Sequence, residues 1–154
     1  MHRMFYQSDF NQDLSMWNVS QVIDMSEMFA MNGAFNQDLH WDTSSLENAE
    51  KMFAKATGFN GDLSTWDVSK VRDFKSFLAG AYSFDRSSDL EHWEMKSAEN
   101  IAFFAEFAFH MKGNFCEWNK HLPADAVKTM AFVGTMCDMP NTPSDGSVCD
   151  ICME

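Results

Sequence analysis

Four cysteines are the residues with the clearest capacity for chemistry in this sequence of 154 residues. All of them lie from position 116 onward, at Cys116, Cys137, Cys149 and Cys152. An even number of cysteines in a loop-rich segment predicts two disulfides, formed outside the reducing cytosol. Pairing Cys116 with Cys137 would leave Cys149 with Cys152, although four cysteines allow three connectivities. A zinc site is the alternative, since Cys149 and Cys152 have half of the required ligand spacing.

Acidic side chains recur at a regular spacing and form the second candidate site. The set consists of Asp13, Asp38, Asp62 and Asp89, accompanied by Asn11, Asn36, Asn60 and Asp85. If these residues stack, their oxygens could bind Ca²⁺. The same side chains also accept hydrogen bonds from backbone amides at turns. We favour the second interpretation, a ladder that caps the backbone, and keep a calcium site as the alternative.

The sequence contains no pattern typical of an enzyme. Five histidines are scattered without a metal-binding or nucleophile-activating spacing, and no glycine-rich phosphate loop occurs. Lys and Arg number 11 against 23 Asp and Glu, so a net charge of -12 disfavours nucleic acid as a partner. The longest apolar run, 101–109, is too short to span a membrane. We therefore expect a non-enzymatic chain without cofactor or bound metal that does not span a membrane.

Aromatic residues reveal an internal repeat of about 25 residues. Five tryptophans are separated by 24, 25, 27 and 25 residues: Trp17, Trp41, Trp66, Trp93 and Trp118. Ahead of the first four stands a phenylalanine, at Phe10, Phe35, Phe59 and Phe84. We expect these side chains to form ladders in a shared core, since a single unit cannot bury its apolar faces alone.

Each unit is predicted to contain one short strand and one short helix. Trp17 and Val19 lie two residues apart, on one face of a strand. Serines at the expected helix starts are typical N-caps, at Ser20, Ser44, Ser69 and Ser97. The apolar residues that follow the first serine have helical spacing: Val22, Met25, Met28 and Phe29.

The resulting fold prediction is an α/β repeat solenoid, similar to leucine-rich repeats, with about five stacked strand-helix units and a cysteine-containing C-terminal cap. Residues 1–5 align with 25–29, so we expect the numbered chain to start part-way through a larger array. The predicted divisions are a partial repeat at 1–9, repeats at 10–34, 35–58, 59–83 and 84–110, a degenerate last repeat at 111–136, and a cap at 137–154.

The repeated motif Phe-Asn-Gln-Asp-Leu-Ser-x-Trp-x-Val-Ser, followed by Val-x-x-Met-x-x-Met-Phe, resembles that of the BspA-like leucine-rich-repeat surface proteins. Such repeats are widespread in bacterial surface proteins and in proteins of marine microalgae. The resemblance extends from Met1 to Cys152. It also covers the closing segment of that family, in which a cysteine precedes the last Trp, a proline follows it and further cysteines lie in a loop.

The resemblance implies adhesion, surface display or protein binding, and it supplies no catalytic residue. We therefore expect a surface or secreted module that binds a protein or a glycan. The alternative is a structural or scaffolding subunit of a larger assembly. The expected location is extracellular or at the cell surface, with an organelle lumen as the alternative.

Overall fold

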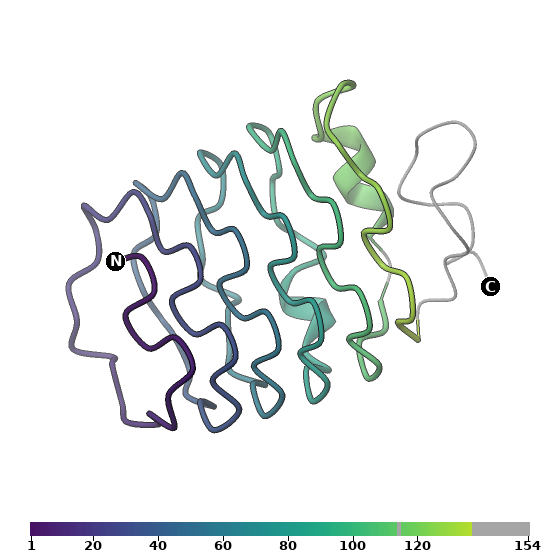
Figure 1. The fold of residues 1–154 in the computed structure, drawn as a ribbon. Helices are drawn as coiled ribbons and strands as arrows, with labels where there is room; N and C mark the ends of the chain where they lie inside the picture. The colour runs from purple at the N-terminus through teal and green to yellow at the C-terminus, as the bar shows by residue number, and fades with distance from the viewer. Residues whose placement is uncertain (114, 137–154) are drawn as a thin grey trace.

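The computed structural model describes residues 1–113 and 115–136, and for Cys116 the backbone alone. Over these residues the chain winds in successive coils that lie side by side along one axis, with the N-terminus at one end (Figure 1). Single parallel β-bridges join neighbouring coils, linking in turn Asp24, Asn48, Asp73, Asn100 and Val127. We call this arrangement the coil stack.

The predicted α/β repeat solenoid of strand-helix units is wrong. The described residues contain no α-helix and no strand beyond the single bridges; their two helices are short 3₁₀-helices, η1 (Ser87–Asp89) and η2 (Cys116–Lys120). Within this same part of the chain, no helix has the length and apolar character needed to cross a bilayer. Consecutive hydrogen-bonded turns take the place of the predicted elements.

Five segments, which we call the turn rows, stand where helices were predicted: residues 25–32, 49–56, 74–81, 101–108 and 128–135. In the row 49–56, the Met52 amide donates to the Ala49 carbonyl and closes a turn. The next amide, of Phe53, donates instead to the Phe77 carbonyl of the following coil at 2.9 Å. The first four rows repeat this alternation, so every second amide joins one coil to the next.

Two positions in each of the five turn rows have a positive φ, four residues apart, and so do Arg3 and Gln7, which precede the first row. They form two columns across the coils: Arg3, Glu27, Lys51, Ser76, Phe103 and Met130 in the first, and Gln7, Met31, Lys55, Gly80, Phe107 and Gly134 in the second. For a residue other than glycine this conformation costs about 1–2 kcal/mol. An α-helix requires a negative φ throughout. The columns are therefore incompatible with a helix, and the hydrogen bonds between coils offset their strain.

The serines predicted as helix N-caps lie in turns as well. The Ser44 amide donates to Asp42 Oδ1 at 3.1 Å, and the Ser69 amide donates to Asp67 Oδ1 at 3.0 Å. The Ser20 amide makes the same bond to Asn18. These are Asx turns, in which the side chain two residues earlier accepts the amide. The local chemistry of a helix start is thus used to turn the chain.

The segments predicted as strands are also built from turns. The Trp17 amide donates to the Leu14 carbonyl, and the Val22 amide donates to the Val19 carbonyl. Few backbone bonds join neighbouring coils here; one runs from the Leu39 amide to the Asp62 carbonyl at 3.1 Å. Strand pairing is thus not what holds this side of the coils together.

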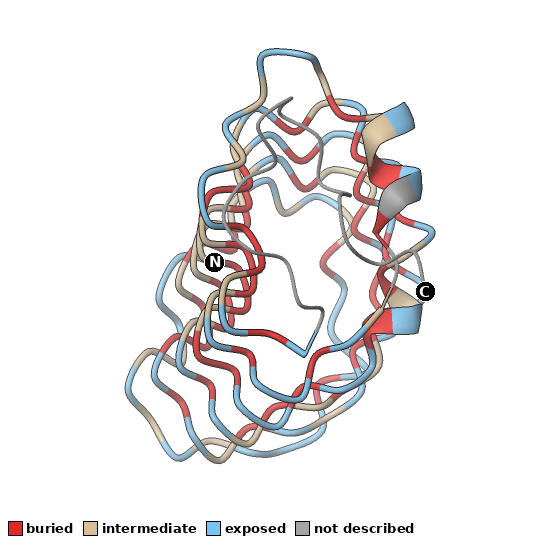
Figure 2. Cartoon of the chain, turned by 90° about the vertical axis from the view of Figure 1, so that its right-hand side faces the viewer, coloured by how far each residue is buried: buried red, intermediate tan, exposed pale blue. Residues whose placement is uncertain are grey.

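Stacked rings fill the interior of the coils and form one continuous core. Figure 2 shows buried residues recurring in successive coils on both sides of the stack. Phe29 stacks on Phe53 of the next coil with ring centroids 5.5 Å apart, and Phe35 stacks on Phe59 at 6.0 Å. Within one coil, Phe53 stacks on Phe59 at 4.0 Å. Each fully buried Phe contributes about 1.5–3 kcal/mol relative to an exposed one. Because the rings contact the coils on either side, the core requires the whole stack.

Candidate functional site

The Asp and Asn ladders bind backbone amides. Asp13 Oδ1 accepts the Ser15 amide at 2.7 Å, and Asp38 Oδ1 accepts the Asp62 amide of the next coil at 2.9 Å. Among the asparagines, Asn36 accepts the Asn60 amide at 2.7 Å. These bonds tie each coil to itself or to its neighbour. Among the described residues, no three His, Cys, Asp or Glu side chains gather in a way that could hold a metal ion.

A further column of this kind was missed in the sequence. It consists of the Asp and Asn residues at the bridges, Asp24, Asn48, Asp73 and Asn100, each of which accepts the amide two residues later through Oδ1. Their spacing repeats with the tryptophans, so the signal was present. These positions follow the serines at the predicted helix starts, and a helix gives such a column no role.

Two neighbouring carboxyls of the Asp ladder differ in their electrostatics. Hydrogen bonds from Ser64, with a smaller contribution from His40, lower the pKa of Asp62 to about 2. Burial raises the pKa of Asp89, and the charge of Asp62 nearby adds to this effect. Arg86 Nη1 lies 4.0 Å from Asp62 Oδ2 and 3.8 Å from Asp89 Oδ2. Asp89 therefore differs from Asp62 in the direction of its pKa shift.

The tryptophan ladder is stacked and also hydrogen-bonded. Trp41 and Trp93 lie 6.4 and 6.3 Å from Trp66, one on either side. Indole Nε1 donates to a leucine carbonyl of the preceding coil at three positions: Trp41 to Leu14, Trp66 to Leu39 and Trp118 to Leu90. At the N-terminal end the ladder is open, and Trp17 is 38% exposed. Side-chain donors thus supply bonds between coils that the backbone does not make here.

Trp93 is the exception in this ladder. It is only 4% exposed, yet its Nε1 has no hydrogen-bond partner among the described residues. The exception coincides with a longer unit, since Phe84 and Leu90 are six residues apart where Phe59 and Leu63 are four apart. The longer segment contains η1, which ends at Asp89. Leaving a buried donor unpaired costs about 1–3 kcal/mol, so the position calls for an explanation.

A pocket of about 280 Å³ lies beside η1, and we call it the η1 pocket. Its lining includes the buried Trp66 and Trp93, the carboxyls of Asp67 and Asp89, and the exposed His92. Asp89 Oδ2 is buried and, within the described part of the chain, likewise has no hydrogen-bond partner. The two buried polar side-chain atoms found without a partner there both belong to residues that line this one pocket.

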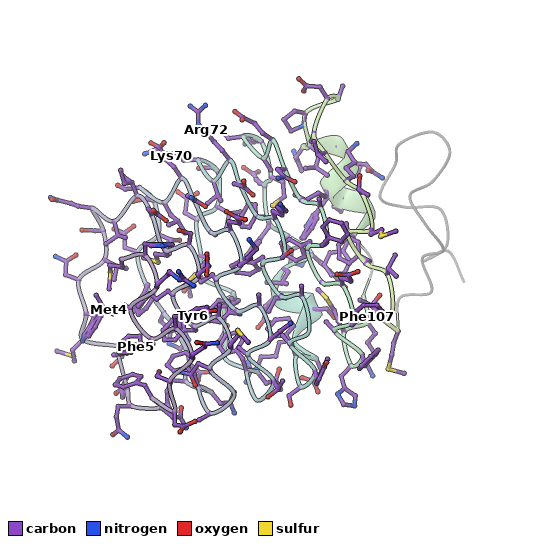
Figure 3. All side chains as sticks on the ribbon, viewed as in Figure 1. Met4, Phe5, Tyr6, Lys70, Arg72 and Phe107 are labelled. Atoms are coloured by element: carbon purple, nitrogen blue, oxygen red, sulfur yellow. The ribbon has the colours of Figure 1, made fainter. Side chains whose placement is uncertain are left out.

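A second hollow, of about 290 Å³, lies on the turn rows, and we call it the turn-row groove. Ala30, Ala54 and Ala79 line it from the same position in three successive rows, each directly before the second column of positive φ. Long side chains flank them, including Met31 and Lys55. The groove lies on the side of the coils that carries Tyr6 and Phe107 (Figure 3), across the stack from η1 (Figure 2).

Three half-exposed aromatic rings lie near the last turn rows. Tyr82 stacks on Phe109 with ring centroids 5.3 Å apart, and Phe107 lies 6.0 Å from Phe109. The four cysteines predicted to form disulfides or a zinc site fall outside what the structure describes, because the side chain of Cys116 and residues 137–154 are not included. Disulfide formation therefore stays a prediction.

The family comparison fits a repeating chain. A family model described as "Mycoplasma protein of unknown function, DUF285" matches residues 1–87 and, again, residues 40–137. The chain belongs to this family. DUF285 is a BspA-like repeat family, so the resemblance holds at the level of the family, whereas the leucine-rich form of the repeat is not shown. No curated protein and no solved structure matches the chain.

Proposed function

We propose that this DUF285 chain is a non-enzymatic binding module, secreted or displayed at a surface, that holds an extended segment of a protein partner in the turn-row groove. The observation that carries the proposal is the column of Ala30, Ala54 and Ala79, which in the first two of these coils lies between larger side chains, Glu27 and Met31 in one and Lys51 and Lys55 in the other. Small residues at one position in successive coils leave room along the stack axis, and repeat proteins commonly bind partners along such a surface.

The charges of the groove favour a polypeptide as its occupant. Glu27 is paired with Arg3 at 3.1 Å, and Lys51 is paired with Glu50 at 2.8 Å. Lys55 makes no ion pair within the described part of the chain, so its ammonium group is available to a carboxylate of the partner. Met31 is 43% exposed and offers apolar contact beside it. Mixed charges and an adaptable thioether suit a peptide that carries an acidic residue.

Selection from a random peptide library on the immobilised chain tests this function. We expect enriched peptides to contain an acidic residue and to bind saturably in solution. Ala54→Arg, which fills the groove, should weaken their binding at least about tenfold, equivalent to 1.4 kcal/mol. Thr65→Arg, an exposed position away from the groove, is the matched control and should leave the affinity unchanged. No enriched peptide, or equal binding by both variants, would overturn the proposal.

A structural or scaffolding role is the second candidate, and the continuous core from Leu14 to Phe132 favours it. A stack in which each coil supports the next is a suitable rigid spacer. The same selection distinguishes the two functions, because a spacer has no need for an open groove and would enrich no peptide there.

A further inference from the structure

Two residues that line the η1 pocket each have a buried polar atom without a hydrogen-bond partner among the described residues. Trp93 Nε1 can only donate a hydrogen bond, and an ionised Asp89 Oδ2 can only accept one. Neither atom has a hydrogen-bond partner within residues 1–113 and 115–136, although Arg86 Nη1 lies 3.8 Å from Asp89 Oδ2. In the equivalent positions of neighbouring coils, the Trp66 indole reaches Leu39 and the Trp118 indole reaches Leu90. The lack of a partner is thus specific to the coil that carries η1.

A hydroxyl group is the chemistry that satisfies both atoms, because it accepts and donates at once. An ammonium ion could serve Asp89 but could not accept from Trp93. A carboxylate or phosphate could accept from Trp93 but would meet the negative charges of Asp67 and Asp89; the third carboxylate of the lining, Glu94, is paired with Lys96. The ligand is therefore neutral and carries hydroxyls.

The size and lining of the pocket limit the ligand further. Its volume of about 280 Å³ is at the lower end of small-molecule sites, so it suits a single ring with its substituents. The Ser88 hydroxyl adds a group that can both donate and accept, whereas the Ser64 and Ser69 hydroxyls hydrogen-bond to Asp62 and Asp67 and can still accept. The two atoms are buried in the free chain, so the binding proposed below requires side chains of the lining to rotate when the ligand enters.

We propose that the η1 pocket binds a neutral, hydroxyl-rich ligand the size of a monosaccharide, whose hydroxyls accept from Trp93 Nε1 and donate to Asp89 Oδ2. The site lies across the coil stack from the turn-row groove and is independent of the peptide binding proposed above. The chain thereby recognises sugar at one place and polypeptide at another.

Titration of the whole ¹⁵N-labelled chain with methyl glucoside tests the proposal. The five indole N–H signals are assigned with single Trp→Phe variants. We expect the Trp93 signal to shift saturably below about 50 mM, while the Trp41 signal stays in place. Glucuronate, which differs by its negative charge, should bind at least about tenfold more weakly.

Two variants and two controls complete the experiment. Asp89→Asn and Trp93→Phe should each lower the affinity for methyl glucoside at least about tenfold. Asp42→Asn and Trp41→Phe make the same substitutions outside the pocket and should leave the affinity for methyl glucoside unchanged. If Trp93→Phe does not fold, the affinity of Asp89→Asn and the shift of the Trp93 indole signal in the unsubstituted chain still test the proposal. Unshifted Trp93, equal shifts at all five indoles, or unaltered affinity in Asp89→Asn would overturn the proposal. Peptide selection on the groove is unaffected by either result.

Discussion

Asp62 and Asp89 occupy equivalent positions in neighbouring coils, yet they affect stability with opposite sign. Asp62 accepts the Ser64 amide at 2.8 Å and pairs with His40 at 3.2 Å. Asp89 is partly buried, has an unmatched Oδ2 and faces the charge of Asp62. A residue type that repeats in register thus caps the backbone in one coil and lines a pocket in the next.

The pH dependence of two Asn variants separates these roles. The lowered pKa of Asp62 means that its carboxylate stabilises the fold above the unfolded value of 3.8, and that this contribution is lost as the pH falls towards about 2. Asp62→Asn should therefore lower the free energy of unfolding by about 1–2 kcal/mol at pH 7, and by little at pH 2. The pKa of Asp89 is raised, so its contribution is lost as the pH rises; Asp89→Asn should leave the chain equally or more stable at pH 7. Urea unfolding of both variants at pH 7 and pH 2 measures these free energies. An equal loss of unfolding free energy in Asp62→Asn and Asp89→Asn at pH 7 would contradict the assignment of opposite roles.

Trp66 and Trp93 provide a second comparison at this scale. Both indoles are almost fully buried, but only Trp66 donates a hydrogen bond, to the Leu39 carbonyl at 2.7 Å. Trp66→Phe should therefore cost about 1 kcal/mol more than Trp93→Phe, since both variants lose similar ring contacts. Denaturant unfolding of the two variants gives the difference. If Trp93→Phe lowers the free energy of unfolding as much as Trp66→Phe does, Trp93 Nε1 has a hydrogen-bond partner and the interpretation is wrong.

At the scale of elements, the sequence pattern could predict which residues are inside but not how the backbone places them there. Met25, Met28, Phe29 and Asn32 are buried in the first turn row, and their spacing is also that of one helix face. An amphipathic helix and a row of consecutive turns therefore share one pattern. The distinguishing feature is the positive φ, which only Gly80 and Gly134 mark by residue type.

Glycine substitutions distinguish a turn row from a helix. Lys55 has φ 57°, so Lys55→Gly relieves the strain of a left-handed residue and should stabilise the chain by up to about 1 kcal/mol. The neighbouring Ala54 has no positive φ, and Ala54→Gly should destabilise by about 0.5–1 kcal/mol. In a helix both changes would cost about 1 kcal/mol. Thermal unfolding of the pair supplies the test, and destabilisation by Lys55→Gly would favour the helix.

At the scale of the whole molecule, the periodicity of the aromatics predicted a stack with a shared core, because the contacts between units depend only on register. The η1 pocket could not be predicted in this way. Its signal was the longer spacing between Phe84 and Leu90, which indicates an insertion but not the unmatched atoms that result. Deviations from a repeat, rather than the repeat itself, locate this site.

Removal of divalent ions should leave the whole stack intact. Oδ1 atoms of Asp13, Asp38 and Asp62 already accept backbone amides, so the ladder is complete without a metal. We expect the melting temperature to be the same with and without chelator. A fall of many degrees that Ca²⁺ alone reverses would make these carboxylates ligands instead.

Both candidate surfaces depend on one claim, that alternate amides of the turn rows join successive coils. Scalar coupling across hydrogen bonds, measured by NMR on the labelled chain, tests this claim directly. The Phe53 amide nitrogen should couple to the Phe77 carbonyl carbon of the next coil, whose oxygen it meets at 2.9 Å. Coupling from Phe53 to the carbonyl of Ala49, four residues earlier, would show a helix and contradict the account.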